Sequence, residues 1–434
     1  MPFRFRIVAI LSVGLLIVGA CRAPHRLDVD EPPPRASARS VVVWISIDGF
    51  RGDYVDRGQT PLLRRLMREG AYSQKLITIT PSLTFPSHVT EATGVPAGIH
   101  GIASNEFYDP ASSNSELLFK MPSDAALLQA EPIWVTATRQ GIRTLVYDWP
   151  LSYIHDAPVR PAYALPKFEG DLTDEQRLTR ITDTWRNDAS EKPLRLLMGY
   201  IKESDHIGHK YGPESPQIDQ TIHQIDAELQ RFVDQSIALF DQKMKPGDSL
   251  YVLLTTDHGM APVKTHVNVS KLFSTPPVKE VRIATSGPLA LIYLDRLAES
   301  DRAATMTAIL DDLRKHEDFL WAYTRETLPK EWRLDHPTRV GQIILMLKPG
   351  YTFSTKHEQL TYAVGPGDDP QGMHGYPPSI CPEMRGFCVL WRYPSPLGGR
   401  NLGTVHAEQF EPTVARLLHI RPADGATAAP MLER

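Results

Sequence analysis

The chain has 434 residues, of which 42% are hydrophobic and 23% charged, with a formal net charge of −4. This is the composition of an ordinary globular protein, and the length is sufficient for a large buried core. A near-neutral chain without a basic stripe excludes a dedicated surface for duplex nucleic acid, so we expect no such partner. Length alone would allow two or three domains, although large α/β enzymes often keep a single core.

The first twenty residues predict a targeting signal. Arg4 and Arg6 precede a short apolar run that leads to Cys21, and this run is too short for a comfortable transmembrane helix. Small residues before a cysteine resemble the cleavage box of bacterial lipoproteins, in which lipid on Cys21 would anchor the mature chain. We therefore expect a signal peptide over 1–20, a lipid-anchored tether over 21–40, and a periplasmic protein held on a bacterial membrane. A plain secretory signal or an uncleaved anchor is the alternative.

Hydrophobic runs and helical periodicities alternate along the next part of the chain. Residues 41–47 form a continuous, largely β-branched run, which is typical of a buried parallel strand. Residues 60–69 carry apolar positions at helical spacing. The alternation continues with strands over 142–147, 194–201 and 249–255, and with helices over 173–187 and 216–240. This order predicts an α/β fold with a mostly parallel sheet and helices on both faces.

Residues 265–345 break the alternation. They read as two short strands within 281–295, an amphipathic helix over 302–317 and a strand over 341–348. We expect a small α+β insertion on a catalytic domain that comprises 41–264 and 346–422, followed by a tail over 423–434. Within that domain the core resumes with a loop over 365–378, a strand over 386–391 and a final helix near 405–418.

Side chains that could carry chemistry follow the predicted strands. Asp48 follows the first strand, Asp205 and His209 follow the strand over 194–201, and Asp257-His258 follows the strand over 249–255. Ligands of such sheets bind beyond the carboxyl ends of the strands, so we expect these side chains to lie together. Taken singly, each has a plain structural explanation, such as a turn, a helix cap or a surface Asp–His hydrogen bond.

His374 and Thr84 complete the set. His374 is flanked by glycines, which let backbone approach closely, although it could also be a flexible loop histidine. Three aspartates and three histidines make two three-ligand metal sites, and this chemistry suits zinc. Thr84 lies between Pro81 and Pro86, at or near the N-cap of a helix, where a phosphate would be stabilised. By residue pattern alone, a simple N-cap is the favoured explanation of Thr84.

The other histidines and the cysteines have weaker signals. We expect His88 to be a buried, hydrogen-bonded helix residue, His100 to brace the loop ahead of Asn105, and His206 to point away from the ligands. In an oxidising compartment Cys381 and Cys388 could bridge a short loop, but two free, partly buried thiols are equally compatible with the sequence.

Together these motifs resemble the nucleotide pyrophosphatase/phosphodiesterase family of the alkaline phosphatase superfamily. The resemblance runs from about Val41 to Pro422. It rests on the following segments in order: Asp48-Gly-Phe-Arg51, Thr60-Pro61, Pro81-Ser-Leu-Thr-Phe-Pro-Ser-His88, Thr93-Gly94, His100-Gly-Ile-Ala-Ser-Asn105, Asp205-His-Ile-Gly-His209, Thr256-Asp-His-Gly-Met260 and His374-Gly-Tyr376. Glu203-Ser-Asp205 departs from the Glu-Pro-Asp that is common in this family.

The resemblance implies an alkaline-phosphatase-like fold with two zinc ions. One zinc would be held by Asp48, Thr84, Asp257 and His258, and the other by Asp205, His209 and His374. Thr84 would be the nucleophile and would form a covalent phosphothreonine diester. Asn105, aided by the backbone N–H of Phe85, would donate to a phosphate oxygen that gains charge in the transition state. Phe85, Tyr200 and Phe168 are candidates for the substrate pocket.

The resemblance therefore implies hydrolysis of phosphodiester or pyrophosphate bonds, with release of a nucleoside monophosphate. Alternatives on the same scaffold are a phospholipid or choline-type head-group phosphodiesterase and a phosphomonoesterase. A sulfatase is disfavoured, because sulfatases use cysteine or serine in a different motif. A phosphoryl transferase to envelope acceptors and a non-catalytic zinc- or phosphate-binding lipoprotein are further alternatives. The residues predict no oligomeric state.

Overall fold

The computed structural model describes residues 39–57, 59–121, 125–153, 159–274 and 278–432. The predicted signal peptide, Cys21 and the tether up to residue 38 lie outside this part of the chain. Within it, none of the helices combines the length and apolarity that a bilayer crossing requires.

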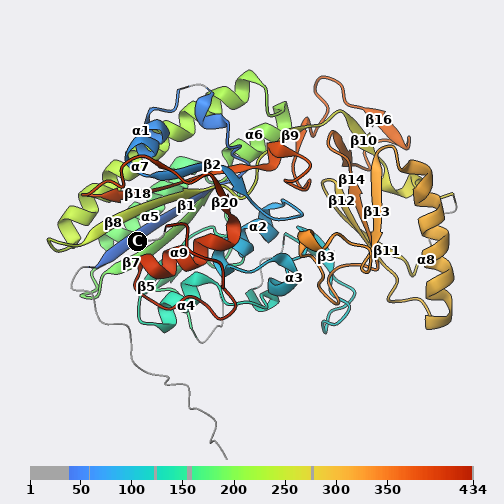
Figure 1. Ribbon diagram of the computed structural model, residues 1–434, viewed down its shortest axis with the longest axis horizontal. Helices are drawn as coiled ribbons and strands as arrows, with labels where there is room; N and C mark the ends of the chain where they lie inside the picture. Colours follow the sequence, from blue (N-terminus) through green and yellow to red (C-terminus); the bar gives the residue numbers. More distant parts are fainter. Residues whose placement is uncertain (1–38, 58, 122–124, 154–158, 275–277, 433–434) are drawn as a thin grey trace, which may run out of the picture. The chain divides into compact units, whose positions relative to one another are not determined.

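A nine-stranded sheet forms the centre of the fold (Figure 1), in the order β19-β2-β18-β8-β1-β7-β5-β6, with β20 also paired to β2. Strands β8, β1, β7, β5 and β6 run parallel, whereas β18 is antiparallel to both β8 and β2. The predicted α/β fold with a mostly parallel sheet is confirmed. The strands are β1 (Ser40–Ile47), β2 (Ala71–Ile77), β5 (Arg143–Val146), β6 (Tyr163–Ala164), β7 (Leu194–Ile201), β8 (Ser249–Thr255), β18 (Gly386–Tyr393), β19 (Arg400–Asn401) and β20 (Thr404–His406).

Helices cover both faces of this sheet, which explains why its central strand is apolar at nearly every position. Alternate residues of β1 belong to separate cores: Val43 packs in the core that includes α1, α5 and α7, and Trp44 in the core that includes α2, α4 and α9. Figure 1 shows α7 along one side of the sheet and α4 and α9 along the other. The helices are α1 (Pro61–Glu69), α2 (Thr84–Thr93), α4 (Ile133–Arg139), α5 (Asp174–Asn187), α7 (Pro216–Lys243) and α9 (Phe410–Leu417).

The structure differs from the sequence-based prediction mainly at element ends. Ser40 opens β1 instead of closing the tether, because it is buried and pairs with Ser249 of β8. The final helix is shorter than the predicted 405–418: Thr404–His406 is strand β20, which uses the free edge of β2, and α9 begins only at Phe410. Helix α7 continues to Lys243, three residues beyond the predicted end at residue 240, although its last buried residue is Phe240.

The insertion contains an antiparallel sheet in the order β11-β12-β14-β13. One face of this sheet shares a core with α8, and the other shares a core with Phe85 and Val89 of α2. The insertion therefore supports the helix that begins at Thr84. Its elements are β11 (Arg282–Ser286), β12 (Leu289–Tyr293), α8 (Glu299–Leu313), β13 (Leu320–Thr324) and β14 (Ile343–Leu347). Beside it lies a three-stranded sheet of β15 (Tyr351–Phe353), β10 (Thr265–Val267) and β16 (Thr361–Ala363).

Candidate active site

Three aspartates follow three neighbouring parallel strands. Strands β8, β1 and β7 are adjacent in the sheet, and Asp257, Asp48 and Asp205 come just after them. Parallel strands end at one edge of a sheet, so side chains that follow them converge. Asp205 lies in the first turn of helix α6 (Glu203–Tyr211), which places His209 one turn further along the same face.

The first group of side chains surrounds His258. Its Nε2 atom lies 3.1 Å from Oδ2 of Asp257 and 3.3 Å from Oδ1 of Asp48. The hydroxyl oxygen of Thr84 lies 3.2 Å from the same Nε2. Thr84 is the first residue of α2, directly after the N-cap residue Leu83. The residues that the family resemblance implies for one metal site are therefore neighbours in the fold.

The second group surrounds Asp205. Its Oδ1 atom lies 3.3 Å from Nε2 of His209 and 3.6 Å from Nε2 of His374. His374 arrives from far along the chain, because β17 (Gly372–Met373) pairs with β9 (Ala261–Pro262) just after the Asp257-His258 loop. The rings of His374 and His258 stack with centroids 3.5 Å apart, so the two groups adjoin.

The spacing of these atoms matches what a metal ion requires. Zinc with four ligands at about 2.1 Å separates neighbouring ligand atoms by about 3.4 Å, the edge of a tetrahedron. The Asp–His separations in both groups run from 3.1 to 3.6 Å. Two sets of side chains could hold a metal ion, namely Asp205 with His209 and His374, and Asp48 with Asp205 and His258.

Hydrogen bonds to backbone carbonyl groups orient the rings of the three histidines at the site. The Nδ1 atoms of His258, His209 and His374 lie 2.8 to 3.0 Å from carbonyl oxygens, which only accept hydrogen bonds. In the neutral rings Nδ1 therefore carries the proton, and the lone pair of Nε2 faces the aspartates. Metal-binding histidines in proteins are commonly held in this way.

Each of the three aspartates has one buried oxygen that lies near histidine nitrogens but accepts no hydrogen bond from the described residues. Oδ1 of Asp48, Oδ1 of Asp205 and Oδ2 of Asp257 are buried, and none of these atoms has a hydrogen-bond partner among the described residues. The opposite oxygens of two of them are held: Tyr200 donates its hydroxyl to Oδ2 of Asp48, and the N–H groups of Gly49 and His258 donate to Oδ1 of Asp257. Buried carboxylate oxygens normally have a partner, so these three oxygens fit cation ligands.

The charges at the site also favour a bound cation. Burial, with the nearby charges of the other aspartates, raises the pKa of Asp48, and burial also raises the pKa of Asp257. Burial opposes ionisation of Asp205 as well, but the charge of His209 outweighs it and holds that pKa low. Burial lowers the pKa of His209, yet the charge of Asp205 outweighs this and raises it to about 9. Three carboxylates in a buried cluster need compensating positive charge.

Gly259 allows the loop after β8 to bend where both Asp257 and His258 must face the site. Its N–H donates to the carbonyl oxygen of Met384 at 3.0 Å. A Cβ atom at this position would lie 1.9 Å from the carbonyl oxygen of Glu383. Close packing against residues 383–384 therefore requires glycine at this position.

Asn105 and Phe85 lie together beside Thr84. The backbone N–H of Phe85 donates to Oδ1 of Asn105 at 3.0 Å. This bond orients the amide so that its NH2 group remains available as a donor. It also occupies the Phe85 N–H, to which the resemblance gives a direct role at the phosphate.

The predicted pocket aromatics have different surroundings. Phe85 is 8% exposed and Phe168 is 40% exposed. The ring of Phe168 contacts Tyr200 at 6.2 Å and the guanidinium of Arg177 at 4.6 Å. Tyr200 directs its hydroxyl to Asp48, a function that the sequence analysis missed. The register of the sheet explains this contact, since Tyr200 pairs with Ser46, two residues before Asp48.

The remaining predictions from the sequence analysis concern residues around the site. His88 is buried on α2, where its Nδ1 lies 2.8 Å from the Thr84 carbonyl and 3.3 Å from Asp257. His100 accepts the N–H of Ile102 ahead of Asn105, as expected. Cys381 and Cys388 are buried and free.

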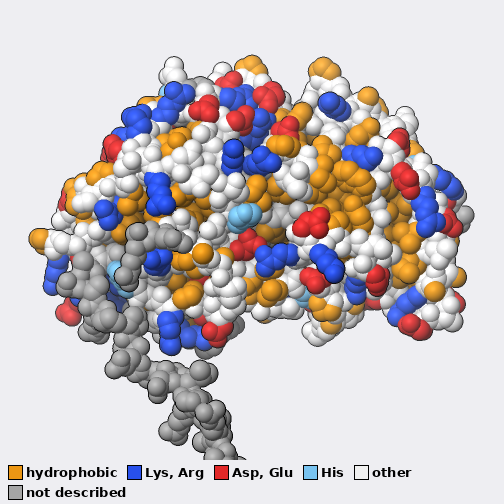
Figure 2. All heavy atoms as spheres, in the orientation of Figure 1, with side chains coloured by type: hydrophobic (Ala, Val, Ile, Leu, Met, Phe, Trp, Pro, Cys, Tyr) orange, Lys and Arg blue, Asp and Glu red, His pale blue; other side chains and the backbone are white. Residues whose placement is uncertain are grey.

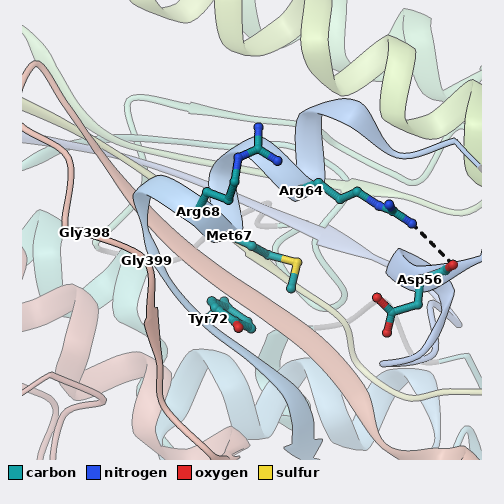
Figure 3. A pocket seen from close by; sticks show the side chains of 7 residues that line it. All are labelled: Asp56, Arg64, Met67, Arg68, Tyr72, Gly398 and Gly399. Atoms are coloured by element: carbon teal, nitrogen blue, oxygen red, sulfur yellow. Dashed lines mark hydrogen bonds between the residues drawn. The ribbon is translucent and has the colours of Figure 1, made fainter.

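Two of the grooves on the described surface differ in their relation to the predicted site residues. One, of about 590 Å³, follows α1 and contains none of the predicted site residues (Figure 3). In it, the guanidinium of Arg64 points to Asp56 and donates to its carbonyl oxygen at 3.4 Å, while Arg68 points away. The other, of about 980 Å³, adjoins His209. On the face in Figure 2, cationic and anionic side chains are interspersed, without a single basic stripe.

Comparisons with known proteins assign the chain to a family. The family model for type I phosphodiesterase/nucleotide pyrophosphatase matches residues 42–377. A pyrophosphatase/phosphodiesterase of Schizosaccharomyces pombe, itself uncharacterised, is 28% identical over 81% of this chain and 71% of its own length. The bis(5'-adenosyl)-triphosphatase enpp4 of Mus musculus is 26% identical over 88% of this chain and 78% of its own length.

Solved structures share the fold. Murine ectonucleotide pyrophosphatase/phosphodiesterase 5, as an inactive threonine-to-alanine variant in complex with AMP, superposes with a TM-score of 0.73 at 23% identity, covering 88% of this chain and 96% of that one. The human protein of the same name gives a TM-score of 0.75 at 22% identity, with the same coverage. The alkaline-phosphatase-like fold is thereby confirmed. The chain belongs to the type I phosphodiesterase/nucleotide pyrophosphatase family and is a hydrolase of phosphodiester bonds.

Proposed function

We propose that this chain uses two zinc ions and Thr84 to cleave phosphodiester or pyrophosphate bonds of nucleotides, with release of a nucleoside monophosphate. One observation carries the proposal. Three buried carboxylate oxygens, which accept no hydrogen bond from any residue that the structure describes, and three histidine Nε2 atoms converge next to the hydroxyl of a helix-start threonine. Asp48, Asp257, His258 and Thr84 would hold one zinc, and Asp205, His209 and His374 the other. When bound, the zinc ions would lower the pKa of the Thr84 hydroxyl and offset phosphate charge.

Thr84 carries the covalent chemistry in this proposal. Its Oγ forms a bond to phosphorus as the bond from phosphorus to the leaving oxygen breaks, and the hydroxyl proton passes to solvent. Water then attacks the phosphothreonine diester, the Oγ–phosphorus bond breaks, and Thr84 regains a proton. The position of Thr84 at the start of α2 supports this role, because a helix N-terminus favours the negative charge of the phosphate.

Asn105 stabilises charge on the phosphate in this proposal. Its Oδ1 accepts the N–H of Phe85, so its NH2 group is the part that remains to donate to a non-bridging oxygen. A donor that is fixed before the reaction begins contributes more than one that must reorganise. Phe85 and the half-exposed Phe168 are the proposed aromatic contacts for the nucleoside.

The location of the enzyme is proposed from the sequence alone. Arg4, Arg6 and the apolar run before Cys21 support export and lipid attachment at Cys21, with the enzyme tethered in the bacterial periplasm. Labelled fatty acid should appear on the full-length chain and be absent from a Cys21→Ala variant.

The substrate class is tested with two aryl phosphates. Signal-free protein supplied with zinc should hydrolyse bis-p-nitrophenyl phosphate much faster than p-nitrophenyl phosphate, and should release AMP from the p-nitrophenyl ester of AMP. Preference for the monoester would establish a phosphomonoesterase on this scaffold. Cleavage of the simple diester together with glycerophosphocholine, but not of nucleotide esters, would favour the head-group alternative.

The nucleophile is tested separately. Thr84→Ala should reduce turnover of the diester by at least about 10⁴-fold, because the covalent route is removed. Zinc content should stay near that of the wild type, since three protein ligands remain at that site. Full activity in this variant, or loss of zinc from it, would contradict the assignment.

A further inference from the structure

Helix α2 starts without the side-chain cap that often holds the first turn of a helix. Its N-cap residue is Leu83, which has no polar side-chain atom. The hydroxyl of Thr84 lies 3.2 Å from Nε2 of His258 and thus faces the candidate site. Other contacts must therefore hold the turn that carries the proposed nucleophile.

The ring of His88 supplies such a contact, one turn further along the helix. Its Nδ1 atom lies 2.8 Å from the carbonyl oxygen of Thr84. A carbonyl oxygen only accepts hydrogen bonds, so Nδ1 carries a proton and its N–H donates to Thr84. The same Nδ1 lies 3.3 Å from Oδ2 of Asp257, without a hydrogen bond between them. The ring therefore lies between the backbone of Thr84 and a carboxylate of the same proposed metal site.

Two aromatic side chains hold the ring of His88 in one orientation. Trp149 and Tyr200 contact it edge-on, with ring centroids 5.1 and 5.3 Å away. The indole N–H of Trp149 also donates to the carbonyl oxygen of His88 at 3.2 Å. The ring is completely buried. It therefore has little freedom to turn, and the same holds for the Thr84 carbonyl group that it binds.

The same face of α2 is attached to β8 at a second point. Glu91 lies three residues after His88, and its Oε2 accepts the hydroxyl of Thr255 at 2.9 Å. Residues three apart share a face of a helix. Thr255 is the last residue of β8, two residues before Asp257. The face of α2 that carries His88 is thereby fixed against the end of the strand that Asp257 follows.

Packing alone does not explain a histidine at this position. The Nε2 atom of His88 is buried and has no hydrogen-bond partner among the described residues. An unpaired buried polar atom destabilises a fold, and an apolar side chain of similar size would avoid that loss. The feature that an apolar side chain could not supply is the bond from the Nδ1 N–H to Thr84.

We propose that His88 is a positioning residue, whose Nδ1 N–H holds the first turn of α2 so that the Thr84 hydroxyl is aligned for attack on phosphorus. In this role His88 itself touches neither the substrate nor the reacting atoms. A displacement of about 1 Å in a reacting group can lower the rate by about 100-fold. The effect should appear in kcat, because the groups that bind the substrate are unchanged. This inference rests on the proposed function, because it takes Thr84 as the nucleophile.

The test compares two amide replacements of His88. Asparagine carries an NH2 group at the position of Nδ1, whereas glutamine carries it one atom further out, at the position of Nε2. At saturating zinc, His88→Gln should lower kcat for the p-nitrophenyl ester of AMP by about 100-fold and change KM by less than about threefold. His88→Asn should keep kcat within about fivefold of the wild type, because the donor to Thr84 is retained. His88→Leu, which adds no buried amide, should show the same loss of kcat as His88→Gln.

Thr93→Val is the matched control. Thr93 is also buried on α2, and its hydroxyl donates at 2.6 Å to the carbonyl oxygen of Val89, four residues earlier. This bond has the same form as that from His88 to Thr84 but lies near the opposite end of the helix. Its removal should leave kcat within about twofold of the wild type, because the turn that carries Thr84 is not affected.

Zinc content gives a readout that does not depend on turnover. Native mass spectrometry should find the wild-type zinc content in all the His88 variants, because only Thr84 is displaced and three protein ligands remain at that site. Wild-type kcat in His88→Gln or His88→Leu, an equal loss in His88→Asn, or loss of zinc would overturn the inference. Failure of the proposed function is a different result, namely full activity in Thr84→Ala or a wild-type enzyme that does not hydrolyse the ester.

Discussion

Tyr200→Phe separates two explanations for a buried aromatic at the site. The sequence suggested that Tyr200 contacts substrate, whereas the structure directs its hydroxyl to Oδ2 of Asp48. Removing the hydroxyl leaves that oxygen buried without this donor and raises the pKa of Asp48 further above its ordinary range. A metal binds the ionised carboxylate, so a higher pKa weakens metal binding at a given pH.

The magnitude follows from the cost of losing this bond. A hydrogen bond to a charged group contributes about 1.5–3 kcal/mol, which corresponds to about 10–100-fold in an equilibrium constant. Loss of an outer hydrogen-bond partner lowers metal affinity over the same range, about 10–100-fold. We therefore expect zinc affinity to fall by about 10–100-fold, and kcat at saturating zinc to fall by less than about threefold.

The assay is competition for zinc with a fluorescent chelator at pH 7.5. Tyr147→Phe is the control, since it also removes a single hydroxyl, but one whose partner is the neutral side chain of Thr184. That control should leave zinc affinity unchanged. Unchanged zinc affinity in Tyr200→Phe together with a raised KM would refute the reasoning and return Tyr200 to the substrate pocket.

Two further changes test the packing and the buried charge. Gly259→Ala would place a Cβ atom 1.9 Å from the carbonyl oxygen of Glu383. This substitution should displace His258, lower the zinc content and reduce the thermal stability of the protein. A normal zinc content would contradict the packing argument. Burial raises the pKa of Glu411 to about 8, from 4.5 for the ordinary carboxyl. The folded state therefore retains a proton that the unfolded chain loses, and stability falls as the pH rises from about 5 to about 8. Glu411→Gln should remove this pH dependence. In the wild-type protein, the difference between the two pKa values corresponds to a change of at most about 5 kcal/mol in the free energy of unfolding. Urea unfolding of the wild type and of Glu411→Gln at pH 5.5 and 8.5 measures this pH dependence. An equal change in stability in the two proteins would contradict the raised pKa of Glu411.

The convergence of the aspartates was predictable because it depends on strand order alone. Asp48, Asp205 and Asp257 each follow an apolar run, and parallel strands end at one edge. The residue pattern singled out His374 by its flanking glycines, but it could not place this histidine beside the aspartates, since its position depends on the pairing of β17 with β9 more than a hundred residues earlier in the chain. Sequence periodicity carries no information about such a long-range pairing.

Other features required the three-dimensional structure. The hydroxyl of Tyr200 reaches Asp48 because β1 and β7 pair in one particular register, and a shift of one residue would turn the side chain to the opposite face. The groove beside His209 has a wall from the distant loop over 364–371, so no local pattern could indicate it. The strand at Thr404–His406 forms because β2 offers a free edge, which overrides the helical pattern assigned to those residues.

The most direct test of the central claim is the number of zinc ions bound per chain, measured by native mass spectrometry after zinc loading. The account predicts two zinc ions in the wild-type protein and in Thr84→Ala. It predicts one in a variant with His209→Ala and His374→Ala together, which removes ligands of the second site only. A wild-type protein that binds one zinc or none, or a double variant that still binds two, would contradict the two-metal site.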